Sequence, residues 1–394
     1  MPNLQVEPAD HCPQPFRQFV VKLHSRCNLA CDYCYVYTMS DQRWEDRPRV
    51  MPRFLVDHTA RRIAEHVVEH RLDKVELIIH GGEPLLAGVD AIEYLVSTVR
   101  SAVPAPVRVS VQTNGTLLDQ TYLELFRRLE IRVGVSLDGG PAANDRHRFR
   151  HNGTGTYHDV RAALRRMDPA PFRPLFLGLL CTVNLANDPV DTYEALLEFA
   201  PPRVDFMLPH GNWTSTPPGL VSTSISTPYA DWLIAVFDRW YGAPNRETGV
   251  RIFDEIINVL LGGHSRLEGI GLSPAGMIVI ETDGMIEQSD ILASSFEGAA
   301  ATGLHVARDP FDAALRLPDV RARQNGVSGL SARCRGCDIR TVCGGGLRAH
   351  RFRAGGGSPV FDNPSVYCAD LYRLITHIRL TIAENLAVLR EGTG

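Results

Sequence analysis

The stretch Cys27-Asn28-Leu29-Ala30-Cys31-Asp32-Tyr33-Cys34 places three thiols close together in the sequence. It follows the apolar run Phe19-Val20-Val21-Lys22-Leu23, a pattern that predicts a buried strand. The thiols then lie on the loop at the carboxyl end of that strand, where α/β barrels place their chemistry. Soft thiolates in such a group select iron–sulfur clusters, zinc or Cu(I). Three ligands are one short of a closed four-ligand site, which on a cubane leaves one iron free to hold a substrate.

Size and composition narrow the class of protein. The chain has 394 residues and a net charge of −4, which gives no sign of nucleic-acid binding. No run approaches ~20 apolar residues, so we expect no membrane span. The N-terminus lacks the basic and apolar segments of a signal peptide. Nine cysteines, seven of them in motif-like groups, favour metal ligands in a reducing cytoplasm over disulfides.

Strand-like and helical patterns alternate after the first strand, which predicts a parallel sheet with right-handed crossovers. Six such units make an α/β partial (β/α)6 barrel. The further strand-like runs are 75–79, 107–111, 131–137, 175–183 and 204–208. The predicted divisions are an irregular lead-in at 1–18, the barrel at 19–209, a bridging loop with helices at 210–268, a glycine-rich domain at 269–368 and a C-terminal helix at 369–394.

The Cys-x3-Cys-x2-Cys spacing, with Tyr33 before the third cysteine, resembles the radical S-adenosylmethionine (SAM) superfamily. The resemblance implies a [4Fe-4S] cluster on Cys27, Cys31 and Cys34 whose open iron holds the amino and carboxylate groups of SAM. Reduction of the cluster then cleaves SAM to a 5′-deoxyadenosyl radical. The other interpretations are a zinc knuckle and three unrelated thiols, but the fourth nearby ligand that zinc requires is missing.

Four barrel segments match the SAM-binding motifs of that superfamily. Gly81-Gly82-Glu83 follows a strand and is expected to contact the SAM amino group, because glycines admit close backbone approach and an acid suits an ammonium. Asn114 is expected at the pocket floor. Ser136 and Arg148 are expected to hold the SAM carboxylate, for which a guanidinium fork is well matched. Arg146 competes with Arg148, and ordinary turns or solvated surface charges are the alternative interpretations of these segments.

A second cysteine group, Cys334-x2-Cys337-x5-Cys343 with Cys368 further on, can close a four-thiolate site. It resembles SPASM, the auxiliary-cluster domain of peptide-maturing radical SAM enzymes. The chain departs from the full pattern, because Ser289, Leu347 and the region of Ser273 lack cysteines. The resemblance therefore implies one auxiliary [4Fe-4S] cluster on the four cysteines and loss of the other. A zinc site with four thiolates is the alternative.

Asp290 follows one of the positions without cysteine, and in related SPASM enzymes an Asp there removes a substrate proton. An Asp fits a general base if partial burial raises its pKa. A surface turn is the alternative interpretation, and Glu281 and Asp283 are nearby rivals.

Local strings narrow the resemblance to FxsB-type radical SAM/SPASM maturases, over roughly residues 16–380. The strings are Lys22-Leu23-His24-Ser25-Arg26-Cys27, Glu281-Thr282-Asp283-Gly284, Cys343-Gly344-Gly345-Gly346-Leu347 and Asp362-Asn363-Pro364-Ser365-Val366-Tyr367-Cys368. The resemblance implies that the chain forms three-residue cyclophanes in a ribosomally made precursor peptide. It also implies a flavodoxin- or ferredoxin-type electron donor. The alternatives are another radical SAM peptide modification (epimerisation, a thioether or a different crosslink) and a non-enzymatic zinc or iron–sulfur protein.

Overall fold

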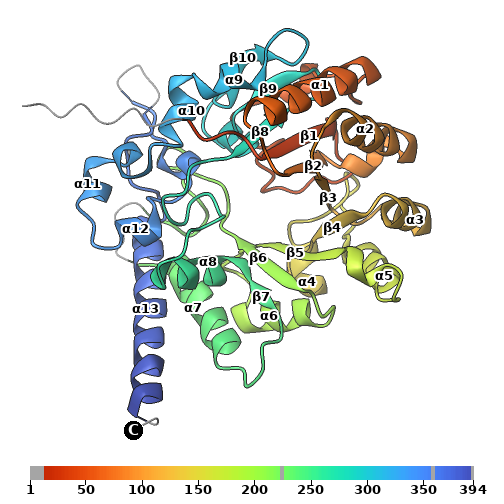
Figure 1. Ribbon diagram of the computed structural model, residues 1–394. Helices are drawn as coiled ribbons and strands as arrows, with labels where there is room; N and C mark the ends of the chain where they lie inside the picture. The colour runs from red at the N-terminus through yellow and green to blue at the C-terminus, as the bar shows by residue number, and fades with distance from the viewer. Residues whose placement is uncertain (1–12, 222–225, 356–359, 392–394) are drawn as a thin grey trace, which may run out of the picture.

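The computed structural model describes residues 13–221, 226–355 and 360–391, and residues 1–12 of the predicted lead-in lie outside this range. Figure 1 shows one curved sheet with helices along its outer side. The sheet has ten strands in the order β10-β9-β8-β1-β2-β3-β4-β5-β6-β7. The strands are β1 (Gln18–His24), β2 (Val75–Gly81), β3 (Val107–Thr113), β4 (Ile131–Ser136), β5 (Phe176–Thr182), β6 (Arg203–Met207), β7 (Gly249–Val250), β8 (Met277–Ile280), β9 (Met285–Glu287) and β10 (Ala301–His305).

Strands β1 to β6 pair in parallel, in chain order, and form the partial barrel. The outer helices are α1 (Arg53–Glu69), α2 (Val89–Ala102), α3 (Gln120–Arg128), α4 (Pro141–Asp145), α5 (Tyr157–Met167) and α6 (Pro189–Leu197). Leu55, Thr59, Ile63 and Val67 recur at helical spacing in α1, and all four are buried. The predicted six-unit α/β barrel is confirmed.

The second half of the chain extends the same sheet. Strand β8 pairs in parallel with β1, and β8, β9 and β10 then pair in antiparallel fashion. Sequence periodicity did not predict this extension, because these strands are short and the region is rich in glycine. The remaining helices are α7 (Pro228–Tyr241), α8 (Arg251–Leu260), α9 (Phe311–Leu315), α10 (Pro318–Ala322), α11 (Ala332–Arg335), α12 (Arg340–Cys343) and α13 (Cys368–Glu391).

Helix α13 projects from the body of the molecule and packs against α7 and α8 with its first half (Figure 1). Its apolar residues Leu371, Leu374, Ile375 and Ile378 are buried. The Asp370 carboxylate accepts hydrogen bonds from the backbone N–H groups of Tyr229 (2.9 Å) and Ala230 (3.0 Å), and so caps α7 from another helix. No helix in the described ranges combines the length and apolar character needed to cross a membrane.

Candidate active site

The three thiols of the first loop line a cavity of about 270 Å³ at the carboxyl ends of the barrel strands. Five of the six residues predicted to bind SAM line the same cavity. They are Gly81, Gly82, Asn114, Ser136 and Arg148. The parallel topology explains this convergence, since the carboxyl ends of β1, β2, β3 and β4 meet at one edge of the sheet.

The two glycines fit against the segment that leads into the cysteine loop. A β-carbon on Gly81 would collide with the His24 carbonyl, and one on Gly82 would collide with the Arg26 backbone and the Tyr37 hydroxyl. The Gly82 N–H donates to the His24 carbonyl (2.9 Å). Glycine is therefore required here for backbone-to-backbone packing, which leaves the cavity wall without side chains at this point.

Glu83 is the predicted SAM-binding residue that does not line the cavity. Its buried carboxylate accepts hydrogen bonds from Thr113 Oγ1 (2.7 Å) and from the backbone N–H groups of Asn114 (2.8 Å) and Leu85 (3.0 Å). Burial raises the pKa of Glu83, although these hydrogen bonds oppose the shift. The carboxylate thus positions the turn that carries Asn114. Asn114 Nδ2 in turn donates to Asn28 Oδ1 (2.9 Å) and lies 3.6 Å from Cys27 Sγ.

Arg148, rather than Arg146, reaches the cavity. Arg148 is buried, its Nη1 donates to the Tyr33 hydroxyl (2.7 Å), and its Nε has no partner among the described residues. Tyr33 donates in turn to Asp138. Arg146 is exposed, and its Nε donates to Asn187 Oδ1 (3.3 Å). A buried guanidinium with an unused donor beside a cavity suits an anionic ligand such as a carboxylate.

The donor set fits a cluster with SAM on its open iron. Burial raises the pKa of the Cys27 thiol to about 12 and that of Cys31 to about 11, so the thiolate forms depend on a bound cation. Three soft thiolate donors that face one cavity fit an iron–sulfur cluster.

Residues 21–200 match the family model of the radical SAM superfamily. The chain carries a radical SAM domain. Proteins of this superfamily bind SAM and a [4Fe-4S] cluster. The three thiols and the five predicted SAM-binding residues that line the cavity lie within the matched range, whereas Met207, Pro209, His210 and Ile291 of its wall lie beyond it.

Three further comparisons extend beyond this domain. The chain is 26% identical over 383 residues to a serine-type anaerobic sulfatase-maturating enzyme of Klebsiella aerogenes, covering 93% of this chain and 86% of that protein. It is 25% identical over 287 residues to a cysteine-type anaerobic sulfatase-maturating enzyme of Clostridium perfringens, covering 70% of this chain and 74% of that protein. The solved structure of native anSMEcpe with bound AdoMet superposes with a TM-score of 0.76 at 21% identity, over 94% of this chain and 99% of that chain, which shows a shared fold.

We call the cavity lined by Cys27, Cys31 and Cys34 the radical SAM cavity. Asp290 lies behind its wall. Its Oδ2 accepts a hydrogen bond from the Tyr35 hydroxyl (2.7 Å) and lies 3.8 Å from Lys22 Nζ. Tyr35 and His210 line the cavity in front of it. Asp290 is buried, which excludes the surface-turn interpretation.

The condition stated for a general base, a pKa raised by partial burial, is not met at Asp290. Burial alone would raise this pKa, but Lys22, His80 and the Tyr35 hydrogen bond together outweigh burial and lower it. The carboxylate is therefore ionised at neutral pH, because Lys22 and the smaller contributions together exceed desolvation, which is the largest single influence. The sequence does carry a signal for a buried ion pair here, since Lys22 is a lysine inside an apolar strand.

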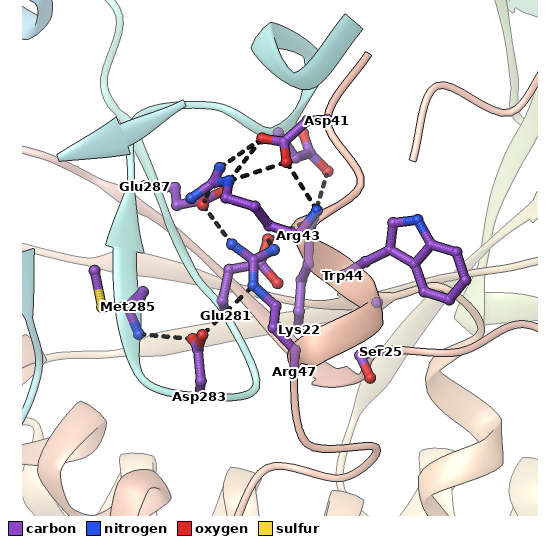
Figure 2. Close-up of polar contacts among 12 residues, drawn as sticks. Lys22, Ser25, Asp41, Arg43, Trp44, Arg47, Glu281, Asp283, Met285 and Glu287 are labelled. Carbon is purple, nitrogen blue, oxygen red and sulfur yellow. Dashed lines mark hydrogen bonds and ion pairs between the residues drawn. The ribbon is translucent and has the colours of Figure 1, made fainter. Parts of the chain in front are cut away.

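The rival acids, the buried Glu281 and the half-buried Asp283, belong to one ion network (Figure 2). Glu281 lies 2.8 Å from Lys22 Nζ and 2.9 Å from Arg47 Nη1, while Asp283 lies 3.5 Å from Arg47 Nε. Figure 2 shows the Arg43 and Arg47 side chains between the β8–β9 hairpin and the segment after the cysteine loop. Neither acid lines the cavity, and both fix the hairpin to the barrel.

The second cysteine group is also brought together. Cys334, Cys337, Cys343 and Cys368 all line a cavity of about 520 Å³. The glycines after Cys343 form a tight turn, because Gly344 adopts a left-handed backbone (φ 61°) and a β-carbon there would meet the Gly271 carbonyl. The Arg351 guanidinium donates to the carbonyls of this turn. Four soft donors at one cavity fit an auxiliary cluster.

Sequence reasoning missed one compact group of metal-type donors on the outside of the barrel. His66 Nδ1 and His70 Nε2 lie 3.0 Å and 2.6 Å from Asp312 Oδ1. His66 Nε2 accepts a hydrogen bond from the Phe16 N–H (3.0 Å). These contacts dock α9 and the chain before β1 onto α1. The i, i+4 spacing of the two histidines was a signal that could have found the pair.

Proposed function

We propose that this chain is a radical SAM peptide maturase that joins an aromatic ring carbon to the Cβ of a nearby residue in a ribosomally made precursor peptide. The observation that carries the proposal is the convergence of Cys27, Cys31, Cys34 and Arg148, whose Nε has no partner in the described part of the chain, on one cavity. The peptide class, the crosslink and the residue roles are parts of this proposal.

A wide cleft supports a peptide substrate. It has a volume of about 720 Å³ and is lined by residues of the 182–187 and 215–219 segments. Tyr33, Thr182, Pro209 and His210 line both this cleft and the radical SAM cavity. A peptide lying in the cleft would reach the cavity past these four residues.

Structural neighbours are consistent with a peptide substrate. One solved structure is described as anSMEcpe with bound AdoMet and Cp18Cys peptide, and another as Streptococcus suis SuiB bound to precursor peptide SuiA. Their sequence identities to this chain are 21% and 12%, with TM-scores of 0.75 and 0.51. This chain covers 72% or more of each of those proteins.

The proposed roles of the cavity residues follow from their chemistry. When bound, SAM and the [4Fe-4S] cluster supply the radical that removes a hydrogen atom from the peptide. Cys27, Cys31 and Cys34 would hold the cluster. Arg148 and Ser136 would orient the SAM carboxylate, with Arg148 itself held by Tyr33. Asn114 would close the floor, and the backbone at Gly81 and Gly82 would lie against the SAM amino group.

Asp290 would accept the proton that the aromatic ring loses when the new bond forms. The Tyr35 hydroxyl stands between Asp290 and the cavity, so it would pass its own proton to Asp290 and take up the one from the ring. Lys22 keeps Asp290 ionised and therefore ready to accept a proton. The peptide loses two hydrogens in total, one from Cβ and one from the ring.

The accompanying electron requires an acceptor. Cys334, Cys337, Cys343 and Cys368 would hold an auxiliary [4Fe-4S] cluster that either takes this electron or serves as a structural element. A flavodoxin- or ferredoxin-type protein would supply the reducing electron for SAM cleavage.

Co-expression of the chain with the small open reading frame beside its gene tests the proposal. Each crosslink should lower the peptide mass by two hydrogens, and fragment ions should fail to separate the two joined residues. Cys31→Ala should leave the peptide unmodified. An unchanged mass with an inverted α-carbon would replace crosslinking by epimerisation. A colourless protein that never cleaves SAM under dithionite would refute the radical mechanism.

A second candidate follows from the relatives named for serine-type and cysteine-type sulfatase maturation. In this case the chain would modify one Ser or Cys residue of a protein substrate. Fragment ions decide between the two candidates, because the mass change would then be confined to a single residue.

A further inference from the structure

A second cavity, of about 390 Å³, adjoins the radical SAM cavity. Leu180, Met207, His210 and Ile291 line both cavities. The second cavity lies where β6 ends against the 265–277 segment and the turn after Cys343. A group bound in it would therefore be next to the proposed reaction centre.

This cavity coincides with the three places where the chain lacks cysteines of the full SPASM pattern. Ser273, Ser289 and Leu347 all line it. The space that these residues enclose is thus left without metal-binding thiols in this chain.

Two buried polar atoms at the cavity have no hydrogen-bond partner within the described part of the chain. They are Ser289 Oγ and His210 Nε2, on side chains of residues that are 1% and 6% exposed. Unsatisfied buried polar atoms cost ~1–3 kcal/mol each, so they mark a place where a ligand group with a matching donor or acceptor gains affinity.

The two acidic residues that line the cavity are paired with arginines, and Arg266, which also lines it, is exposed to solvent. Asp205 is paired with Arg251 (2.9 Å), and Glu268 is paired with Arg323 (2.7 Å). Burial lowers the pKa of His210 to about 4, so this imidazole is neutral at physiological pH. The remaining wall is largely apolar, with Phe206, Met207, Ile252 and Ile270 among its residues. The ligand that fits is an apolar group with one neutral polar atom.

We propose that this cavity binds the aromatic side chain of the substrate peptide, with Ser289 Oγ and His210 Nε2 meeting a phenol hydroxyl or an indole N–H. This inference rests on the proposed function and adds a specificity site to it. The loss of cysteines and the gain of a ring-binding pocket are then two consequences of the same substitutions. Residues that would have held a cluster instead shape the pocket beside the site of bond formation.

Small aromatic molecules test the pocket without any turnover. We would measure binding of 4-methylphenol and toluene to the anaerobic holoenzyme by equilibrium dialysis. Gly276 lines the cavity, and a β-carbon there meets nothing within 4 Å, so Gly276→Phe should fill the space without a backbone clash. We expect it to weaken binding of both molecules at least tenfold. Gly355→Phe, which adds the same ring to an exposed loop, should bind as the wild type does.

Ser289→Ala separates recognition from simple space filling. It should weaken 4-methylphenol binding several-fold and leave toluene binding unchanged, because toluene offers no hydrogen bond. Iron content and thermal melting confirm that each variant is folded and loaded. Wild-type protein that binds neither molecule, or Gly276→Phe protein that binds both as well as the wild type, would overturn the inference.

Measuring crosslinking and binding of the precursor peptide with the same variants distinguishes this inference from the proposed function. If the chain crosslinks its peptide but Gly276→Phe crosslinks and binds it normally, the pocket assignment is wrong and the proposed function stands. If no crosslink forms but Gly276→Phe weakens peptide binding in step with 4-methylphenol, the pocket stands and the proposed reaction is wrong.

Discussion

Lys22 is the residue whose removal tests most of the structural reasoning. Its side chain is 7% exposed and its ammonium lies 2.8 Å from Glu281 and 3.8 Å from Asp290. Lys22→Met keeps the length and apolar stem of the side chain but removes the charge. Two buried carboxylates then lose their shared cation.

Removing one partner of a buried ion pair costs about 3–5 kcal/mol, because the other charge stays buried without compensation. We expect a value near the lower end, about 3 kcal/mol, since Arg47 remains 2.9 Å from Glu281. Lys74→Met is the matched control, because Lys74 is exposed and is the other lysine of the chain. An exposed substitution of this kind should change the free energy of unfolding by less than ~0.5 kcal/mol.

The variant should also shift the pH dependence of crosslinking. In the wild type, the pKa of Asp290 lies below its ordinary value, so its ionised form stabilises the fold above about pH 4 and this contribution is lost as the pH falls through the folded-state pKa. Without Lys22, burial is no longer outweighed and the pKa of Asp290 rises. The acidic limb of the rate profile should therefore move to higher pH in Lys22→Met and stay in place in Lys74→Met.

Urea unfolding of the anaerobic holoenzyme measures the free energy of unfolding. The crosslinking rate between roughly pH 5 and pH 9 locates the acidic limb, since a raised pKa of Asp290 would bring the limb into this range. A loss of stability no larger than that of Lys74→Met would refute the buried-pair argument. If Lys22→Met loses stability but its acidic limb stays in place, Asp290 does not take part in the proton transfer. Lys22 would then have a structural role alone.

Three further predictions address other parts of the molecule. Arg148→Gln should weaken SAM binding to the cluster-loaded protein by about 1.5–3 kcal/mol, tenfold or more, as measured by equilibrium dialysis; Arg146→Gln should change it less than twofold, and equal effects would contradict the assignment of Arg148. Cys368→Ser should lower the iron content from about eight to about four atoms per chain, if each site holds a four-iron cluster; zinc found in the wild-type protein would instead support the four-thiolate zinc alternative. Gly344→Ala should lower stability by ~1–3 kcal/mol in urea, because it forces a strained backbone against Gly271, whereas Gly336→Ala, where a β-carbon meets only ordinary contacts, should lie within ~0.5 kcal/mol of the wild type.

The barrel and the cavity residues could be predicted because their signals are local. Helical and strand periods mark β1 to β6, and parallel strands bring their carboxyl ends together whatever lies between them. This is why Cys27, Gly82, Asn114 and Arg148, far apart in the chain, were correctly expected near one another. Their contacts to SAM stay predictions.

The charges and the exact placements could not be predicted, because they depend on contacts between distant segments. Glu83 occupies its place behind the wall because two donors from the end of β3 and one from its own turn converge on it. The pKa of Asp290 depends on Lys22, which is 268 positions earlier in a different strand. The extension of the sheet by β8 likewise follows from a pairing with β1 that no local pattern announces.

The Asp370 cap on α7 connects the second cysteine group to the rim of the proposed peptide cleft. Asp370 follows Cys368 by two positions, and the Tyr229 N–H that it holds belongs to a residue lining the cleft. Tyr229 in turn donates to the Pro218 carbonyl on the rim (2.7 Å). Loss of the proposed auxiliary cluster, through oxygen damage for example, would thus deform the rim of the proposed peptide cleft as well as remove the proposed electron acceptor. An inactive Cys368 variant therefore gives no information about electron transfer until its affinity for the peptide has been measured.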